Sequence, residues 1–195
     1  MFGSRTVKTL VALCVAMFLG ASVLILMETA PIRPASGDLA AVGGHGEVSA
    51  ALVARTDLPL QRIKWRNIVI HSTAPGEQQD IASRCHFVID SDETGGPGAR
   101  ATMLWDRQAE GYHVAGVSWR DFNTDSVGVC LVGDFSRRRP SSRQIELLVE
   151  LVRAIQRACN IPADHVYLHS DLDRRTDSPG AAFPVREFTA RLLRR

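Results

Sequence analysis

Apolar positions after about residue 65 gather in short runs that polar or glycine-rich stretches interrupt. Short runs rich in β-branched and aromatic residues are typical of buried strands. They predict strands at 68–70, 85–89, 127–133 and 166–168. The segment DSDETGGPGA after the second run indicates a turn, and residues 102–105 are expected to return from it as the partner strand of a hairpin.

Two further segments show helical spacing instead. Pro140-Ser141-Ser142 precedes apolar residues spaced three and four apart, so a helix with a serine N-cap is predicted, ending near Asn160. A last amphipathic helix is predicted from Pro184 to Leu193, with the proline in its first turn. Four strands are therefore predicted before the first of these helices, and one strand between the two helices.

Residues 10–27, LVALCVAMFLGASVLILM, contain no charged side chain. At about 1.5 Å per residue, such a helix nearly spans a hydrocarbon core of about 30 Å. We expect a retained single-pass anchor, because the apolar core of a cleaved signal peptide is normally about 7 to 15 residues. Arg5 and Lys8 place residues 1–9 in the cytoplasm and the rest of the chain in the periplasm, bound to the inner membrane. Secretion to the periplasm after signal cleavage is the alternative.

Residues 28–60 are rich in proline, glycine and alanine and show no sustained helical or alternating pattern. We interpret them as a tether and lead-in to one globular domain at 61–195. The net charge of +2 is that of Arg5 and Lys8, so the chain after them is neutral. This balance argues against a nucleic-acid partner, which selects concentrated positive charge.

The three cysteines beyond the predicted anchor have no metal-type spacing. Cys130 and Cys159 lie in apolar patterns and are expected to be packed in the core.

Histidine ends two of the predicted strands, at Val-Ile-His71 and Tyr-Leu-His169. The loop after His169 is rich in oxygen-bearing side chains that could supply a third ligand. A catalytic zinc is held by three protein ligands and keeps an open position for water. The pattern therefore suggests a metal site with His71 and His169 as two ligands.

Five stretches in order extend this suggestion: IVIHSTA at 68–74, CHFVID at 85–90, HVAG at 113–116, DSVGVCLVGDF at 125–135 and HSDLDRRTDSPGAAFP at 169–184. Together they resemble the zinc-dependent N-acetylmuramoyl-L-alanine amidases, a family that includes peptidoglycan-recognition proteins. The resemblance implies an α/β fold, with a central mixed β-sheet flanked by helices. It also implies a groove for peptidoglycan or muropeptides, and zinc held by His71 and His169. The implied reaction is hydrolysis of the amide between N-acetylmuramic acid and L-alanine.

The third ligand depends on how the last stretch is aligned. The family pattern Thr-x-Cys-Pro-Gly places Ser178 at the cysteine and Thr176 at a position that assists catalysis. The pattern Lys-Thr-Asp-Pro-Gly, with one inserted residue, makes Asp177 the ligand and puts Arg175 at the basic position. We favour Asp177, because a carboxylate binds zinc well whereas a neutral hydroxyl does so poorly. Ser178 is the alternative.

The resemblance also suggests roles for other residues. Arg175 or Thr176 would stabilise the developing oxyanion, and His113 would line the groove or polarise substrate. His86, within a strand, is expected to be packed. Cys85 stands where many members carry a tyrosine that orients the reacting groups. Ser178 and Cys85 motivate a rival hypothesis, in which the domain binds peptidoglycan without cutting it.

Overall fold

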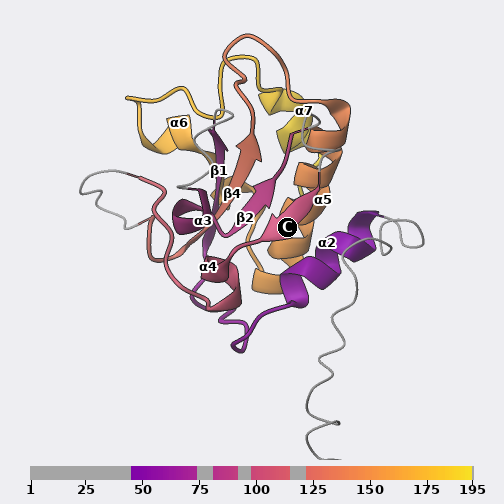
Figure 1. Ribbon diagram of the computed structural model, residues 1–195, viewed down its shortest axis with the longest axis vertical. Helices are drawn as coiled ribbons and strands as arrows, with labels where there is room; N and C mark the ends of the chain where they lie inside the picture. The colour runs from indigo at the N-terminus through magenta and orange to yellow at the C-terminus, as the bar shows by residue number, and fades with distance from the viewer. Residues whose placement is uncertain (1–44, 74–80, 92–97, 115–121, 195) are drawn as a thin grey trace, which may run out of the picture. The chain divides into compact units, whose positions relative to one another are not determined.

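The computed structural model describes residues 45–73, 81–91, 98–114 and 122–194, which all belong to one compact unit, Leu39–Arg195. One five-stranded sheet, in the order β3-β2-β4-β1-β5, forms its centre (Figure 1). The strands are β1 (Asn67–Thr73), β2 (Phe87–Ile89), β3 (Ala99–Ala101), β4 (Ser126–Val132) and β5 (Val166–Leu168). All neighbouring strands pair in parallel except β2 and β3, which are antiparallel. The expected mixed sheet is therefore present.

One face of the sheet is apolar. Alternate residues of a strand point to opposite faces, and Ile68 and Ile70 of β1 lie on the same face as Val127 and Val129 of β4. These side chains are fully buried and form the main core with helix α5 (Ser142–Cys159). Figure 1 shows α5 lying along this side of the sheet.

The opposite face carries the polar groups. His71 of β1 is paired with Cys130 of β4, and His86 donates its backbone N–H to Gly128 O at 2.9 Å, just before β2 begins. Three helices of the described segments have only four residues each: α3 (Ile81–Arg84), α4 (Met103–Asp106) and α6 (His169–Leu172). The sheet therefore separates a hydrophobic layer from a layer that contains histidines.

Helix α5 begins and ends as the sequence predicts. Ser141 is its N-cap and forms a capping box with Gln144, in which each side chain bonds the other residue's backbone N–H. Asn160 ends it in the left-handed conformation, with φ of 59°. The last helix, α7 (Val185–Ala190), follows Pro184 as expected but stops short of Leu193.

Three local expectations are wrong. A helix, α2 (His45–Ala54), lies within the predicted lead-in and packs against α5, which supplies the partner that a weakly patterned segment needs. The partner strand of the hairpin is β3 rather than residues 102–105, because the Thr102 hydroxyl accepts from Leu104 N and caps α4 instead. His71 lies inside β1, because the pairing with β4 continues to Thr73.

Within the part of the chain that the structure describes, no helix is both long enough and apolar enough to cross a membrane. The predicted anchor at 10–27 lies outside those residues.

The two faces generate a first prediction at Gly128 of β4. A Cβ at this position would lie 2.6 Å from Nδ1 of His113, far inside contact distance. We expect Gly128→Ala to destabilise the domain by about 1–3 kcal/mol through overpacking. Denaturant unfolding measures this loss. Gly98→Ala is the matched control, since no atom lies within 4 Å of its added Cβ; equal losses in both variants would contradict the packing argument.

Candidate functional site

The sheet register brings His71 and His169 together. Ile70 of β1 pairs with Leu168 of β5, so the next residue of each strand emerges at the same edge. The two imidazole rings lie with their centroids 4.7 Å apart at an interplanar angle of 53°. Residues 98 positions apart in the chain thus form one pair, as the sequence predicts.

The Nε2 atoms of both histidines are buried and have no hydrogen-bond partner. A buried polar atom without a partner costs free energy that a fold normally avoids. Two such nitrogens on neighbouring rings fit a metal ion, for which an imidazole lone pair is a good ligand. His71 and His169 therefore fit the zinc site that the sequence implies.

The electrostatic surroundings keep these histidines neutral. Burial lowers the pKa of His71 well below its ordinary value, and the nearby His113, His169 and Arg84 lower it further. Burial also lowers the pKa of His169, although the charge of Asp173 opposes this effect. Neutral imidazole is the form that binds metal, so the pair is prepared for a cation at neutral pH.

Ser178 is held beside this pair. Its Oγ accepts a hydrogen bond from Ser72 N at 3.0 Å, and its carbonyl accepts one from Ser170 N at 2.9 Å. Ser72 and Ser170 each follow one of the two histidines in the chain. The loop is therefore fastened so that residue 178 lies next to both strand ends.

Asp177, the predicted third ligand, lies differently. Its side chain is exposed, and its carbonyl accepts from Gly180 N at 2.6 Å in the turn that follows. Among the described residues there is no group of three or more His, Cys, Asp or Glu side chains that could hold a metal ion. The structure thus brings His71 and His169 together and does not add Asp177 to them.

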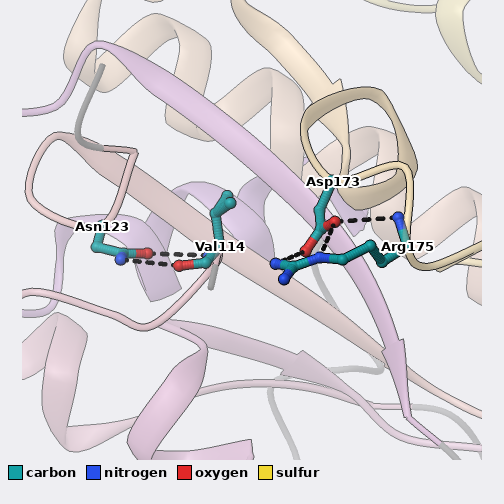
Figure 2. A network of polar contacts seen from close by, with 4 residues as sticks. All are labelled: Val114, Asn123, Asp173 and Arg175. Carbon is teal, nitrogen blue, oxygen red and sulfur yellow. Dashed lines mark hydrogen bonds and ion pairs between the residues drawn. The ribbon is translucent and has the colours of Figure 1, made fainter. Parts of the chain in front are cut away.

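Arg175 is bound to Asp173 (Figure 2). Its Nε and Nη2 donate to the two carboxylate oxygens at 2.8 and 2.7 Å. The ion pair is exposed on the arginine side, and these hydrogen bonds hold the pKa of Asp173 well below its usual range. The neighbouring Thr176 Oγ1 accepts from Ser178 N at 3.1 Å. Asp171 acts as a cap, since its Oδ2 accepts from Leu168 N at 2.8 Å.

His113 lies next to His71 on the polar face, with ring centroids 5.3 Å apart. It is only 1% exposed, and its Nε2 donates to Ser126 O at 3.2 Å, which fixes the tautomer. His86 lies 5.5 Å further along and is packed, accepting from Gly128 N at Nδ1 and donating to Ala109 O from Nε2. The two histidines continue the row from His71 into the interior.

Sequence reasoning missed two neighbours of the histidine pair. The backbone N–H of Ser72 donates to Ser178 Oγ. The only feature of the sequence that could have pointed to Ser72 is its position directly after His71. Arg84 lies close enough for its charge to lower the pKa of both His71 and His169. A basic residue just before CHFVID in the sequence could have indicated it.

The three cysteines within the described residues, Cys85, Cys130 and Cys159, are buried and unlinked. A hydrogen bond with Cys130 and burial raise the pKa of the Cys85 thiol well above its ordinary value. Burial likewise raises the pKa of Cys159 to about 12. The predicted packing of Cys130 and Cys159 is confirmed.

Comparisons with known proteins agree with this geometry. The sequence profile of a family described as N-acetylmuramoyl-L-alanine amidase matches residues 48–181. No curated protein sequence matches the chain.

Among solved structures, the amidase LysC from Clostridium intestinale is 24% identical with a TM-score of 0.53, over 69% of this chain and 90% of that one. AmiD from E. coli, solved with an anhydro-N-acetylmuramic acid peptide substrate, is 21% identical with a TM-score of 0.54, over 66% and 57%. AmpDh3 from Pseudomonas aeruginosa, solved with anhydromuramic pentapeptide, is 24% identical with a TM-score of 0.52, over 66% and 60%. At these identities the likeness is one of fold.

The buried His86 generates a prediction about pH. Burial lowers its pKa from 6.5 to about 3, so below pH 6.5 the unfolded chain binds a proton that the folded domain does not. The stability that the folded domain has with a neutral His86 is fully present above pH 6.5 and is lost as the pH falls toward 3. At pH 5 the expected loss is about 2 kcal/mol.

Denaturant unfolding at pH 7.5 and 5 measures this loss. His86→Gln cannot titrate, so the pH dependence of its unfolding free energy should be smaller than that of the wild type. The same dependence in both proteins would contradict the assignment.

Proposed function

The chain belongs to the N-acetylmuramoyl-L-alanine amidase family, and on this premise we propose that it uses zinc to hydrolyse the amide between N-acetylmuramic acid and L-alanine in peptidoglycan. One observation carries the zinc dependence. The ring centroids of His71 and His169 lie 4.7 Å apart, and both Nε2 atoms are buried without a hydrogen-bond partner. A bound cation would satisfy both nitrogens. Bound zinc would supply an activated water and polarise the scissile carbonyl.

The third position of the metal site is that of Ser178. Its hydrogen bonds to Ser72 and Ser170 support this assignment over the predicted Asp177, whose side chain is exposed. A neutral hydroxyl is a weaker zinc ligand than a thiolate or carboxylate. Zinc would therefore be held less tightly than by three strong ligands, and activity would depend on free zinc.

The chain's own residues would act on the substrate carbonyl. Thr176 accepts from Ser178 N and keeps its hydroxyl proton, which it can donate to a developing oxyanion. Arg175 would first have to leave Asp173, with which it shares two short hydrogen bonds. This geometry favours Thr176 for the oxyanion role and gives Arg175 the role of ordering the loop.

A second function is favoured by the same serine. If Ser178 cannot complete a metal site, the domain would bind peptidoglycan without cutting it. Cys85 supports this alternative, because its buried thiol hydrogen-bonds with Cys130 where a tyrosine hydroxyl would otherwise serve the site.

We also propose that the domain works in the periplasm, held at the inner membrane by residues 10–27. The uncharged run of that segment and the basic residues before it support this location.

Zinc content tests the histidine pair. We expect the purified protein, equilibrated with micromolar zinc, to bind one zinc ion and to release stem peptides from purified sacculi. His71→Ala should lose both, because it removes one of the two nitrogen ligands. His165→Ala is the control for zinc content alone, since its Nδ1 bonds Arg66 O at the other end of β5. If the folded wild type binds sacculi but neither binds zinc nor cleaves them, the binding function is established instead.

Substitutions in the loop identify the third ligand. We expect Ser178→Cys to tighten zinc binding by tenfold or more, since about 1.4 kcal/mol is a factor of ten and a thiolate replaces a hydroxyl. Asp177→Ala should leave zinc affinity nearly unchanged. Competition with a fluorescent zinc chelator measures both. Loss of zinc in Asp177→Ala, with no gain in Ser178→Cys, would restore Asp177 as the ligand.

A further inference from the structure

A cavity opens at the opposite end of the strands from the histidine pair. Its volume is about 450 Å³, within the range of small-ligand sites. Arg62 and Arg66 line it from the segment before β1, and His165 lines it from the turn before β5. His71 is five residues beyond Arg66, which at about 3.3 Å per residue separates the two sites by roughly 17 Å.

The cavity presents positive charge that the fold does not neutralise. No carboxylate in the described segments lies within ion-pair distance of Arg62 or Arg66, and both side chains are exposed. His165 donates from Nδ1 to Arg66 O at 3.1 Å, so its Nε2 is the ring nitrogen left for other contacts. Arg62 also lies near the Cys159 thiol. Burial raises the pKa of this thiol, and the positive charge of Arg62 partly opposes that effect.

The rest of the lining is mostly apolar, with Asn160 as its polar member. Trp65 is buried at the base of the segment, and Pro162 and Cys159 contribute from the end of α5 and the turn after it. Ile63 is 89% exposed, more than any other large hydrophobic residue that the structure describes. Guanidinium groups bind carboxylates through paired hydrogen bonds, and an apolar lining favours an anion that carries small apolar groups.

We propose that this cavity binds the free carboxylate end of a short peptide with small apolar side chains, the chemistry at the end of an uncleaved peptidoglycan stem peptide. The identity of the polymer rests on the proposed function, whereas the carboxylate site does not. A phosphate ion would use the arginines but not Ile63 and Trp65. Two sites on one domain would hold a polymeric substrate by avidity, because the second contact becomes intramolecular.

Calorimetric titration of the full-length protein in detergent with N-acetyl-D-alanyl-D-alanine tests the site. We expect saturable binding that weakens at high salt and is lost with the C-terminal amide of the same dipeptide. Arg62→Gln and Arg66→Gln should each weaken binding about tenfold, because each removes a charged hydrogen-bond donor. Arg186→Gln, an exposed arginine on α7, is the matched control and should bind as the wild type does.

Two further measurements distinguish this proposal from the zinc proposal and from phosphate binding. Dipeptide binding should persist in His71→Ala, so a failure of the zinc proposal leaves this result intact. Inorganic phosphate that binds as tightly as the dipeptide, and competes with it, would overturn the peptide assignment. Absence of saturable dipeptide binding, or equal binding by the wild type and both arginine variants, would overturn the site itself.

Discussion

The parallel pairing of β1 with its two neighbours is the constraint on which the rest of this domain depends. β1 lies between β4 and β5, and its register with β5 sets Ile70 opposite Leu168. Because that register is set by the fully buried Ile68 and Ile70 on the apolar face, a slip by one residue would turn His71 into the core. The packing that stabilises the sheet is therefore also what aligns His71 with His169.

On the polar face, two histidine side chains lie close to the backbone of β4 at Gly128. Glycine at 128 lets the His113 ring approach β4, and its backbone N–H binds Nδ1 of His86. Burial lowers the pKa of both imidazoles and keeps them neutral, and it outweighs the hydrogen bonds to backbone carbonyls, which raise the pKa. A row of neutral rings thus leads from the interior to the pair whose Nε2 atoms remain unpartnered. These two Nε2 atoms lie together at one edge of the sheet, where a ligand can satisfy both.

The two candidate sites lie at opposite ends of the same strands and differ in chemistry. Neutral nitrogens at the carboxyl ends of β1 and β5 suit a cation, whereas the arginines before their amino ends suit an anion. The strands act as rigid spacers between the two sites. A polymer with both amide bonds and free carboxylates could contact the domain at both ends.

Local sequence determined the elements whose signals are local. The cap at Ser141, the stop at Asn160 and the short β-branched strands follow from neighbouring residues, as does the placement of both histidines near strand ends. The family resemblance over 68–184 supplied the sheet and the expected metal. Helix α2 was missed because its helical form depends on packing against α5, and Thr102 was misassigned because capping competes with strand pairing.

Only the tertiary structure shows that the loop holds Ser178 beside the histidine pair, and which partners Arg175 and Cys85 have. The hydrogen bond between Ser72 and Ser178 joins residues 106 positions apart, and the alignment of one loop could not distinguish Ser178 from Asp177. The sequence alone determined that each of the two histidines would lie at or near the end of a buried strand, because strand patterns are local. Which side chain stands beside them depends on how a loop closes against a distant strand, and that is a property of the folded chain.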